Sequence, residues 1–287
     1  MFKFWMYQLG AFLVNHLPSK VSYRLGVFLS DLHYLFSFRD QRLVRNNLKI
    51  ILETDKNFSP LAREVFRNFG RYLVEFFRMA RHVDLNFIQE KVRVKNLEYI
   101  EEVLEKGKGG ILVSGHIGNW ELGAAVISLM GFPPTVIALP HKERPVNDLF
   151  NYQRQIKGIT VIPVSNSVRK SIETLRGNGV MALNVDRDFS ANGEILDFFG
   201  KKTLIPKGAA IFSCKTGAAI IPIFLIREAE DSFTLEICEP IYPSRIVEGI
   251  VDEDSLVALM KQYAKIMEDK IRQYPTQWLM FREFWVK

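Results

Sequence analysis

The sequence is poor in the residues that build covalent or metal-bound frameworks. Its two cysteines, Cys214 and Cys238, stand far apart in apolar surroundings, which excludes a disulfide framework and favours buried thiols in a reducing compartment. Its five histidines are scattered, and none has a second ligand at a helical interval, so their spacing predicts no metal site. The chain also lacks a Gly-x-Ser-x-Gly elbow, which counts against a serine nucleophile.

Long hydrophobic runs are absent too. A membrane-spanning helix needs about 20 mostly apolar residues, and polar residues interrupt every such window in residues 2–38. This segment also lacks the compact apolar core and cleavage site of a signal peptide. We therefore expect two short helices, 4–17 and 19–36, that lie in a membrane interface with Trp5 and Tyr7 as anchors. Two alternatives remain open: the helices cover part of the globular core, or one of them spans the membrane.

No internal repeat, low-complexity tract or linker divides the sequence. With 287 residues, 48% of them hydrophobic and 24% charged, the chain can bury the core of one large α/β domain. We expect membrane-interface helices over residues 1–39 and the α/β domain over residues 40–287. The net charge of +6 predicts attraction to anions, which could be nucleic acid, anionic lipid or an acidic carrier protein.

A basic helix follows the N-terminal segment and is expected to begin at Ser59 and Pro60. At 100° per residue, five arginines fall within an arc of roughly 80°; they are Arg63, Arg67, Arg71, Arg78 and Arg81. Guanidinium groups bind phosphate and carboxylate bidentately, so this face suits anionic lipid, with an ordinary solvated face as the alternative. Because the aromatic residues lie on the opposite side, where the helix must bury them, we do not expect nucleic-acid binding.

Short apolar strands alternate with helices in the rest of the chain. Strands are expected at 111–113, 135–139, 159–164 and 180–185, with further strands at 219–226 and 233–238. This rhythm is typical of a mostly parallel sheet covered by helices on both faces. Adjacent phenylalanines in the predicted loop 196–203 would be exposed, which suits contact with an acyl chain or a membrane.

The stretch from Gly109 to Glu121 runs from a buried strand into a helix. Asn119 is a good N-cap, which places Glu121 in the first helical turn and His116 at the carboxyl end of the strand. We expect the turn between them to bring Glu121 back to His116, so that the carboxylate holds one imidazole nitrogen while the other faces a substrate. That is the arrangement of a general base. The alternative is an ordinary strand-end histidine and a first-turn acid.

Other polar residues follow neighbouring strands at the same edge of the predicted sheet. Arg144 and Arg154 come after strand 135–139 and could bind a phosphate or carboxylate, with surface ion pairs as the alternative. Asp186 and Arg187 come directly after strand 180–185. We therefore expect them near His116.

The string Ser114-Gly-His-Ile-Gly-Asn-Trp-Glu121 resembles the HX4D/E motif of the lysophospholipid acyltransferase superfamily, in the branch of bacterial late lipid A acyltransferases. The likeness covers residues 45–282; further similar blocks begin at Arg45, Arg144, Asp186 and Gly217. The C-terminal block departs from the family pattern. It reads Trp278-Leu-Met-Phe-Arg282, without the second Trp and the His of the usual Trp-x-Trp-x-His-x-Arg, which leaves the acceptor open.

The resemblance implies a glycerol-3-phosphate acyltransferase-like fold and a membrane-associated O-acyltransferase. His116 would deprotonate a glycolipid hydroxyl that attacks the thioester of an acyl carrier protein or coenzyme A, and Glu121 would orient His116. The backbone from Gly115 to Asn119, at the helix N-terminus, and Arg154 would hold the tetrahedral intermediate. The substrate-binding residues implied are Gly118, Asn119, Arg144, Arg154, Asp186 and Arg187.

This chemistry requires no metal and no bound cofactor. We expect a monomer on the cytoplasmic face of the bacterial inner membrane, either peripheral or anchored by its N-terminal segment. The expected acceptor is a lipid A precursor. The alternatives are another acceptor, such as phosphatidylinositol mannoside or a lysophospholipid, water as the acceptor in a thioesterase or lipase, and a catalytically silent membrane adaptor of the same fold.

Overall fold

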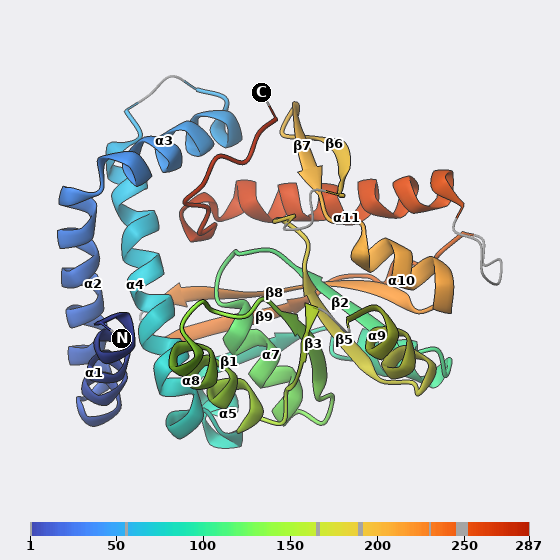
Figure 1. The fold of residues 1–287 in the computed structure, drawn as a ribbon, viewed down its shortest axis with the longest axis horizontal. Coiled ribbons are helices and arrows are strands. Elements are labelled where there is room, and N and C mark those ends of the chain that lie inside the picture. The colour runs from blue at the N-terminus through green and yellow to red at the C-terminus, as the bar shows by residue number, and fades with distance from the viewer. Residues whose placement is uncertain are drawn as a thin grey trace.

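A computed structural model shows a seven-stranded sheet between layers of helices (Figure 1). It describes residues 2–54, 57–164, 167–188, 192–229, 231–244 and 252–286, with side chains from residue 4 onward. The strand order is β1-β9-β8-β2-β5-β3-β4. The strands are β1 Val92–Lys95, β2 Gly110–Ser114, β3 Pro134–Ala138, β4 Thr160–Pro163, β5 Val180–Asn184, β8 Ala219–Ala229 and β9 Ser232–Ile237. All neighbours pair in parallel except β8 and β9, which confirms the mostly parallel sheet.

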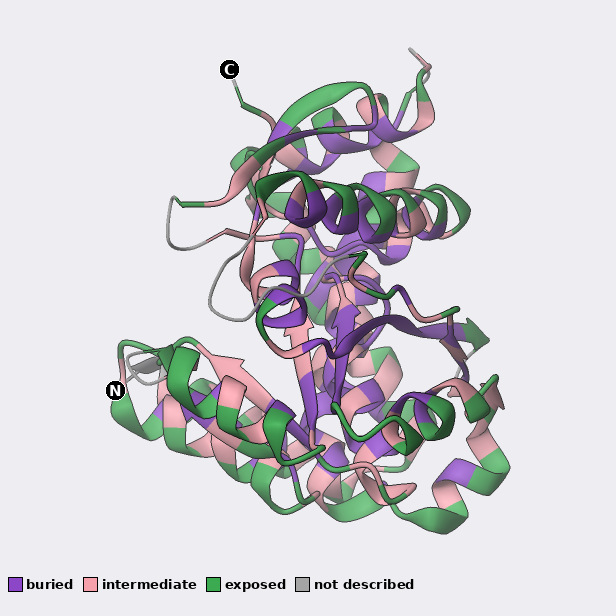
Figure 2. Cartoon of the chain, turned by 90° about the vertical axis from the view of Figure 1, so that its right-hand side faces the viewer, coloured by how far each residue is buried: buried purple, intermediate pink, exposed green. Residues whose placement is uncertain are grey.

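Helices cover both faces of this sheet. On one side lie α5 Leu85–Lys91, α6 Glu98–Glu105, α7 Trp120–Leu129 and α8 Arg144–Gln155; on the other lie α9 Ser167–Arg176, α10 Gly208–Thr216 and α11 Glu253–Gln273. Strand β2 belongs to both cores: Ile111 and Val113 pack into one, and Leu112 packs into the other. Figure 2 shows buried strands in the middle of the molecule, between helices whose outer faces are exposed; the most buried strands are β2 and β8. An apolar run of this kind is what a parallel strand needs when both its faces are covered.

A small antiparallel hairpin, β6 Glu194–Phe198 and β7 Lys201–Ile205, occupies the stretch where a loop was expected. The prediction of exposed phenylalanines is wrong, because Phe198 and Phe199 are 0% and 6% exposed. Their rings pack against Phe284 and Trp285 in the segment that follows the short 3-10 helix η2, Pro275–Gln277. That cover comes from the far end of the chain.

Four helices form a further layer beside the sheet: α1 Phe2–His16, α2 Ser19–Phe36, α3 Phe38–Leu52 and α4 Ser59–His82 (Figure 1). Helix α2 packs closely on α4, because glycines face each other at the crossing. A Cβ on Gly70 would lie 2.5 Å from the carbonyl oxygen of Gly26, too close for any side chain. On the inner side of α1, Ala11 and Val14 join the core. The inner faces of these helices therefore cover part of the globular core.

The other side of α1 and α2 is exposed and apolar. We call it the outer apolar face; its residues are Trp5, Met6, Leu9, Phe12, Val21, Phe28, Leu29, Leu32, Leu35 and Phe36, between 43% and 75% exposed. Of the two predicted anchors, Trp5 belongs to this face, whereas Tyr7 packs inward on Phe77 and Phe150. Among the described residues, no helix combines the length and the apolar character needed to cross a bilayer.

Most of the arginines on α4 are used inside the protein. Arg63 and Arg67 each bind Asp31 of α2 through two hydrogen bonds of 2.8 and 2.9 Å, and they hold the pKa of that carboxyl well below its usual range. Arg71 binds Glu64 at 2.6 Å, and Arg78 donates to backbone carbonyls at the end of α1. Arg63, Arg67 and Arg78 therefore fasten α1 and α2 to α4, whereas the ion pair of Arg71 lies within α4 itself. Their predicted role in binding anionic lipid therefore has a competing structural explanation.

Candidate active site

His116 and Asp186 meet at the carboxyl ends of two neighbouring parallel strands. β2 and β5 pair in register from Gly110 with Val180 to Ser114 with Asn184, and each candidate residue lies two positions beyond its strand. The backbone amide of Val185 continues the ladder by donating to the carbonyl of Ser114 at 2.8 Å. The topology thus brings together two residues that are 70 positions apart in the chain.

Asp186 holds the ring of His116 in one orientation. Its Oδ1 lies 2.6 Å from His116 Nδ1, and its Oδ2 accepts the backbone N–H of His116 at 2.7 Å. Burial would raise the pKa of the fully buried Asp186, but the charge and hydrogen bonds of His116 and the charge of Arg187 bring that pKa down to about 2. The carboxylate is therefore an acceptor only. Nδ1 of His116 therefore donates to it, and in the neutral imidazole this places the lone pair on Nε2.

Glycine is required beside this pair. A Cβ on Gly115 would lie 2.8 Å from Met267 Sδ and 3.0 Å from Asp186 Oδ2, so a side chain there would displace the carboxylate. The ring of His116 stays partly accessible, with 14% of its side chain exposed against 0% for Asp186. The imidazole of His116 is therefore accessible at the surface of the site, whereas the carboxylate of Asp186 is shielded from solvent.

Glu121 makes a different contact from the one expected. Its two carboxylate oxygens accept from Nε and Nη2 of Arg154 at 2.9 and 2.6 Å, and both side chains are almost buried, at 11% and 13% exposed. The structure corrects the predicted pairing: the acid that orients His116 is Asp186, and Glu121 pairs with Arg154. The partner of His116 comes from the segment just after the neighbouring strand β5. A catalytic role for Glu121 stays a prediction.

The turn between His116 and α7 is fixed by hydrogen bonds to the protein. Gly118 N–H donates to the carbonyl of Gln277 at 3.0 Å, and Asn119 N–H donates to the carbonyl of Leu225 at 2.9 Å. Gly118 has φ +62, and a Cβ there would lie 2.0 Å from the oxygen of Leu225. Since these amides already have acceptors, they are not free to bind an oxyanion. Their assignment to substrate binding has no support from these contacts and stays a prediction.

Asn119 is the N-cap of α7, as expected, and it also reaches a buried ion pair. Its Oδ1 accepts the backbone N–H of Leu122 at 3.0 Å, and its Nδ2 donates to Glu75 of α4 at 2.7 Å. Glu75 forms two hydrogen bonds of 2.6 and 2.8 Å with Arg227 of β8, and both side chains are at most 6% exposed. This network fixes the end of the turn against α4 and β8. Neither Glu75 nor Arg227 was identified from the sequence, where each is one charged residue in an amphipathic or apolar run.

The two remaining arginine candidates differ sharply. Arg144 is 92% exposed and forms an ion pair with Asp148 on the same helix, at 3.8 Å, so the structure does not bring it to His116. Arg187 lies beside Asp186, donates to the carbonyl of Leu279 at 2.7 Å, and has a buried Nε without a hydrogen-bond partner. Burial lowers the pKa of Arg187 and the charge of Asp186 opposes that shift. Arg187 therefore adds a mostly buried positive charge to the site.

Aromatic residues close one side of the site, and sequence reasoning missed most of them. The ring of Trp120 lies edge-on to His116, with ring centroids 4.6 Å apart, and stacks on Tyr72 of α4 at 4.6 Å. Trp278, from the C-terminal segment, donates its indole N–H to Asp186 Oδ2 at 3.0 Å. In the sequence, Trp278 stood out only as part of the C-terminal block that departs from the family pattern.

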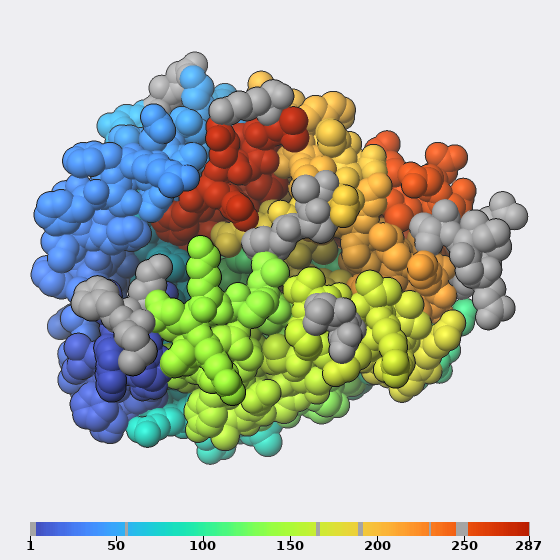
Figure 3. Space-filling model, viewed as in Figure 1, coloured from blue at the N-terminus to red at the C-terminus, as the bar shows by residue number. Residues whose placement is uncertain are grey.

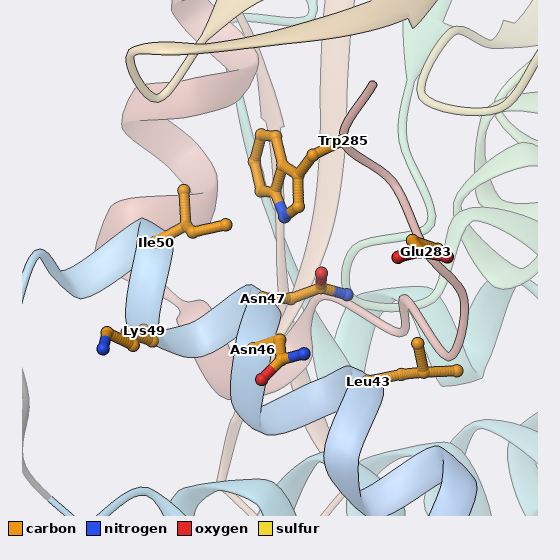
Figure 4. A pocket seen from close by; sticks show the side chains of 7 residues that line it. All are labelled: Leu43, Asn46, Asn47, Lys49, Ile50, Glu283 and Trp285. Carbon is orange, nitrogen blue, oxygen red and sulfur yellow. The ribbon is translucent and has the colours of Figure 1, made fainter. Parts of the chain in front are cut away.

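The surface is hollowed between the C-terminal segment, drawn red, and the α8 region, drawn light green (Figure 3). A separate pocket of about 220 Å³ lies between α3 and the C-terminal segment (Figure 4). It is lined by Leu43, Asn46, Asn47, Lys49, Ile50, Glu283 and Trp285. None of the predicted site residues lines this pocket, so we do not assign it to the site around His116.

Comparison with known proteins identifies the group to which these features belong. The whole chain, residues 1–287, matches the family described as bacterial lipid A biosynthesis acyltransferase. The chain is 26% identical to the phosphatidylinositol mannoside acyltransferase of Mycolicibacterium smegmatis over 286 residues, which cover 98% of this chain and 90% of that protein. It is 22% identical to the lipid A biosynthesis lauroyltransferase of Escherichia coli over 284 residues, which cover 96% of this chain and 90% of that protein.

Proposed function

The chain belongs to the family of bacterial lipid A biosynthesis acyltransferases, and we propose that it moves a fatty acyl chain from an acyl thioester to a hydroxyl of a glycolipid, with His116 as general base. That the protein is an acyltransferase follows from the family and from its named relatives. The observation that carries the assignment of the base is the contact of 2.6 Å between His116 Nδ1 and the buried carboxylate of Asp186.

In the proposed reaction, His116 Nε2 removes the proton of the acceptor hydroxyl as the oxygen attacks the thioester carbonyl carbon. The new C–O bond gives a tetrahedral oxyanion, whose collapse breaks the C–S bond, and the imidazolium returns the proton to the leaving thiolate. Asp186 stabilises the imidazolium that forms between the two steps, because its charge lies next to Nδ1. A positioned base of this kind contributes on the order of 10²- to 10⁴-fold to the rate.

Positive charge around the base supports binding of anionic groups on the substrates. Arg187 lies beside Asp186. The positive charge of Arg282 is near enough to lower the pKa of Arg187. Arg154 is neutralised by Glu121, so we assign that ion pair to shaping the wall of the site next to α7 and α8. Phosphate groups of the thioester carrier or of the lipid headgroup are suitable partners for Arg187.

The acceptor we propose first is a lipid A precursor, because the family that matches the whole chain is described by that pathway. Phosphatidylinositol mannoside is the second candidate, because the acyltransferases named for it are 26% to 28% identical to this chain. Both acceptors are glycolipids that offer sugar hydroxyls, so the same base serves either reaction. The thioester donor is an acyl carrier protein or coenzyme A.

The outer apolar face supports peripheral binding to a membrane, and we propose that α1 and α2 lie on the cytoplasmic leaflet of the bacterial inner membrane. Exposed rings such as Trp5, Phe28 and Phe36 suit the interface between headgroups and acyl chains. Exposed cations at Lys20, Arg24 and Arg39 can meet the anionic headgroups around them. A monomer bound in this way needs no spanning helix.

The test of the proposed function is transfer of a labelled acyl chain from acyl carrier protein or coenzyme A to separate lipid acceptors. The panel is a lipid A precursor, phosphatidylinositol mannoside, a lysophospholipid and buffer alone, followed by mass spectrometry of the products. We expect ester formation on a glycolipid and loss of that product in His116→Ala. Release of free fatty acid without an acylated lipid would instead identify a thioesterase. Equal, absent signal in wild type and variant across all acceptors would indicate the silent adaptor.

A further inference from the structure

The C-terminal segment pairs with the turn that carries His116. The backbone N–H of Leu279 donates to the carbonyl of His116 at 2.7 Å, and the N–H of Gly118 donates to the carbonyl of Gln277 at 3.0 Å. Between these bonds, Ile117 and Trp278 face each other in an antiparallel bridge. This pairing acts as a short extra strand, and it delivers the side chain of Trp278 to the buried side of the site.

Trp278 completes the set of donors around Asp186. The Oδ2 atom accepts from the backbone N–H of His116 at 2.7 Å and from Trp278 Nε1 at 3.0 Å, while Oδ1 lies 2.6 Å from Nδ1 of the His116 ring. Two donors on one oxygen fix the plane of the carboxylate. Asp186 is 0% exposed and Trp278 is 2% exposed. Bulk water therefore does not reach the carboxylate and cannot replace the hydrogen bond from the indole N–H.

We propose that Trp278 is a positioning residue, whose indole N–H holds Asp186 in the orientation that receives the hydrogen of His116 Nδ1. This proposal rests on the proposed function of His116 as general base. Trp278 acts through Asp186 and is not itself a catalytic residue. Without its N–H, the carboxylate can turn about its Cβ–Cγ bond, and the imidazole loses its preference for the tautomer that leaves Nε2 free.

The competing explanation is that a buried indole N–H simply takes whatever acceptor is near. Trp285, from the same C-terminal segment, argues against that as a general rule here. Its Nε1 is buried and has no hydrogen-bond partner (Figure 4 shows its indole above α3). The fold thus leaves one indole N–H unpaired, yet directs the other to the carboxylate next to the proposed base.

The two tryptophans give a matched pair of variants. Trp278→Phe and Trp285→Phe both replace an indole with a smaller ring in the same segment, but only the first removes a hydrogen bond to Asp186. A hydrogen bond to a charged group is worth enough for a loss of roughly 10- to 100-fold in kcat. We expect that loss in Trp278→Phe with KM for donor and acceptor unchanged. We expect wild-type kinetics in Trp285→Phe.

A second measurement separates positioning from loss of packing. Nitrogen-15 NMR of the imidazole rings reports the tautomer of each of the five histidines, with His116 assigned by its absence in His116→Ala. We expect a single tautomer with the hydrogen on Nδ1 in wild type and in Trp285→Phe, and a mixture in Trp278→Phe. A lower kcat with an unchanged tautomer, or an unchanged kcat, would overturn the proposal.

The result also distinguishes this proposal from the proposed function. If His116→Ala still transfers acyl chains, the assignment of the base fails. If His116→Ala is inactive while Trp278→Phe keeps full kcat, only the role of Trp278 fails. Should Trp278→Phe not fold, benzothienylalanine at position 278 keeps the shape of the indole without its N–H, and the same outcomes apply.

Discussion

The imidazole of His116 is held by Asp186, and the acid five positions after it, Glu121, is held by Arg154. Two carboxylates at one sheet edge therefore have separate partners. The first adjoins the ring that faces the site, and the second neutralises a nearly buried guanidinium. This division of contacts gives the two acids different expected effects on activity and stability.

Asp186→Asn is expected to lower kcat by roughly 10²- to 10⁴-fold, because a neutral amide cannot stabilise the imidazolium and its NH2 group can impose the wrong tautomer. Steady-state transfer assays on the glycolipid acceptor measure this loss. Asp197→Asn, the same substitution at an exposed ion pair on β6, is expected to leave kcat unchanged. Near-normal turnover in Asp186→Asn would contradict the role given to the carboxylate.

Glu121→Gln is expected to destabilise the fold by roughly 3–5 kcal/mol, because it leaves Arg154 nearly buried without its charge partner. Arg154→Gln should cost a similar amount, and the double variant should cost clearly less than the sum of the two. Urea unfolding measures all three free energies. The matched control is Glu173→Gln, whose ion pair with Arg169 is exposed and contributes about 1 kcal/mol or less. Additive losses in the double variant would mean that the two side chains act independently.

Acid should destabilise the protein partly through Asp186. Its pKa is about 2 in the folded protein, against an ordinary value of 3.8. A depressed pKa stabilises the fold above the unfolded value, so this contribution is complete above pH of about 4 and is lost as the pH falls through about 2. It amounts to roughly 2 kcal/mol. Unfolding free energies between pH 5 and pH 2.5 should fall less steeply in Asp186→Asn than in wild type. Parallel curves for the two proteins would contradict this contribution of Asp186 to acid sensitivity.

Membrane binding should depend on the outer apolar face. Replacing Phe28 and Phe36, which are 63% and 75% exposed, by Ser should weaken sedimentation with anionic vesicles by at least tenfold, because each ring contributes on the order of 1–3 kcal/mol when buried. Val168→Ser on α9, which is 57% exposed, should bind like wild type. Unchanged binding of the double variant would remove α1 and α2 from the proposed membrane contact.

Local rules of the sequence predicted the elements well where one residue type determines the structure. The cap at Asn119, the start of α4 at Ser59 and the apolar strand β2 appear as expected. They depend on hydrogen bonds or periodicity within a few residues. Helix α5 and the hairpin of β6 and β7 were missed, the hairpin because its phenylalanines are covered by residues from the end of the chain.

The partner of His116 could not be predicted from sequence spacing either, because it too comes from a segment far away in the chain. Strand ends indicated that His116 and Asp186 share an edge, yet only the register of β2 and β5 places one directly against the other. The arginine face of α4 shows the limit of periodicity as well. It located the arginines correctly, but Asp31, which binds two of them, lies on a different helix. Contacts between distant segments decide which charge meets which.

The buried carboxylate of Glu75 forms hydrogen bonds both to the outer helix α2 and to the turn that follows His116. Glu75 accepts from Tyr23 of α2 at 3.1 Å and from Asn119, three positions after His116, at 2.7 Å. The carboxylate of Glu75 thus connects α2, which is proposed to lie on lipid, with the turn that follows the proposed base His116. In the proposed binding mode, the folded chain and not the bilayer fixes where His116 lies relative to α2.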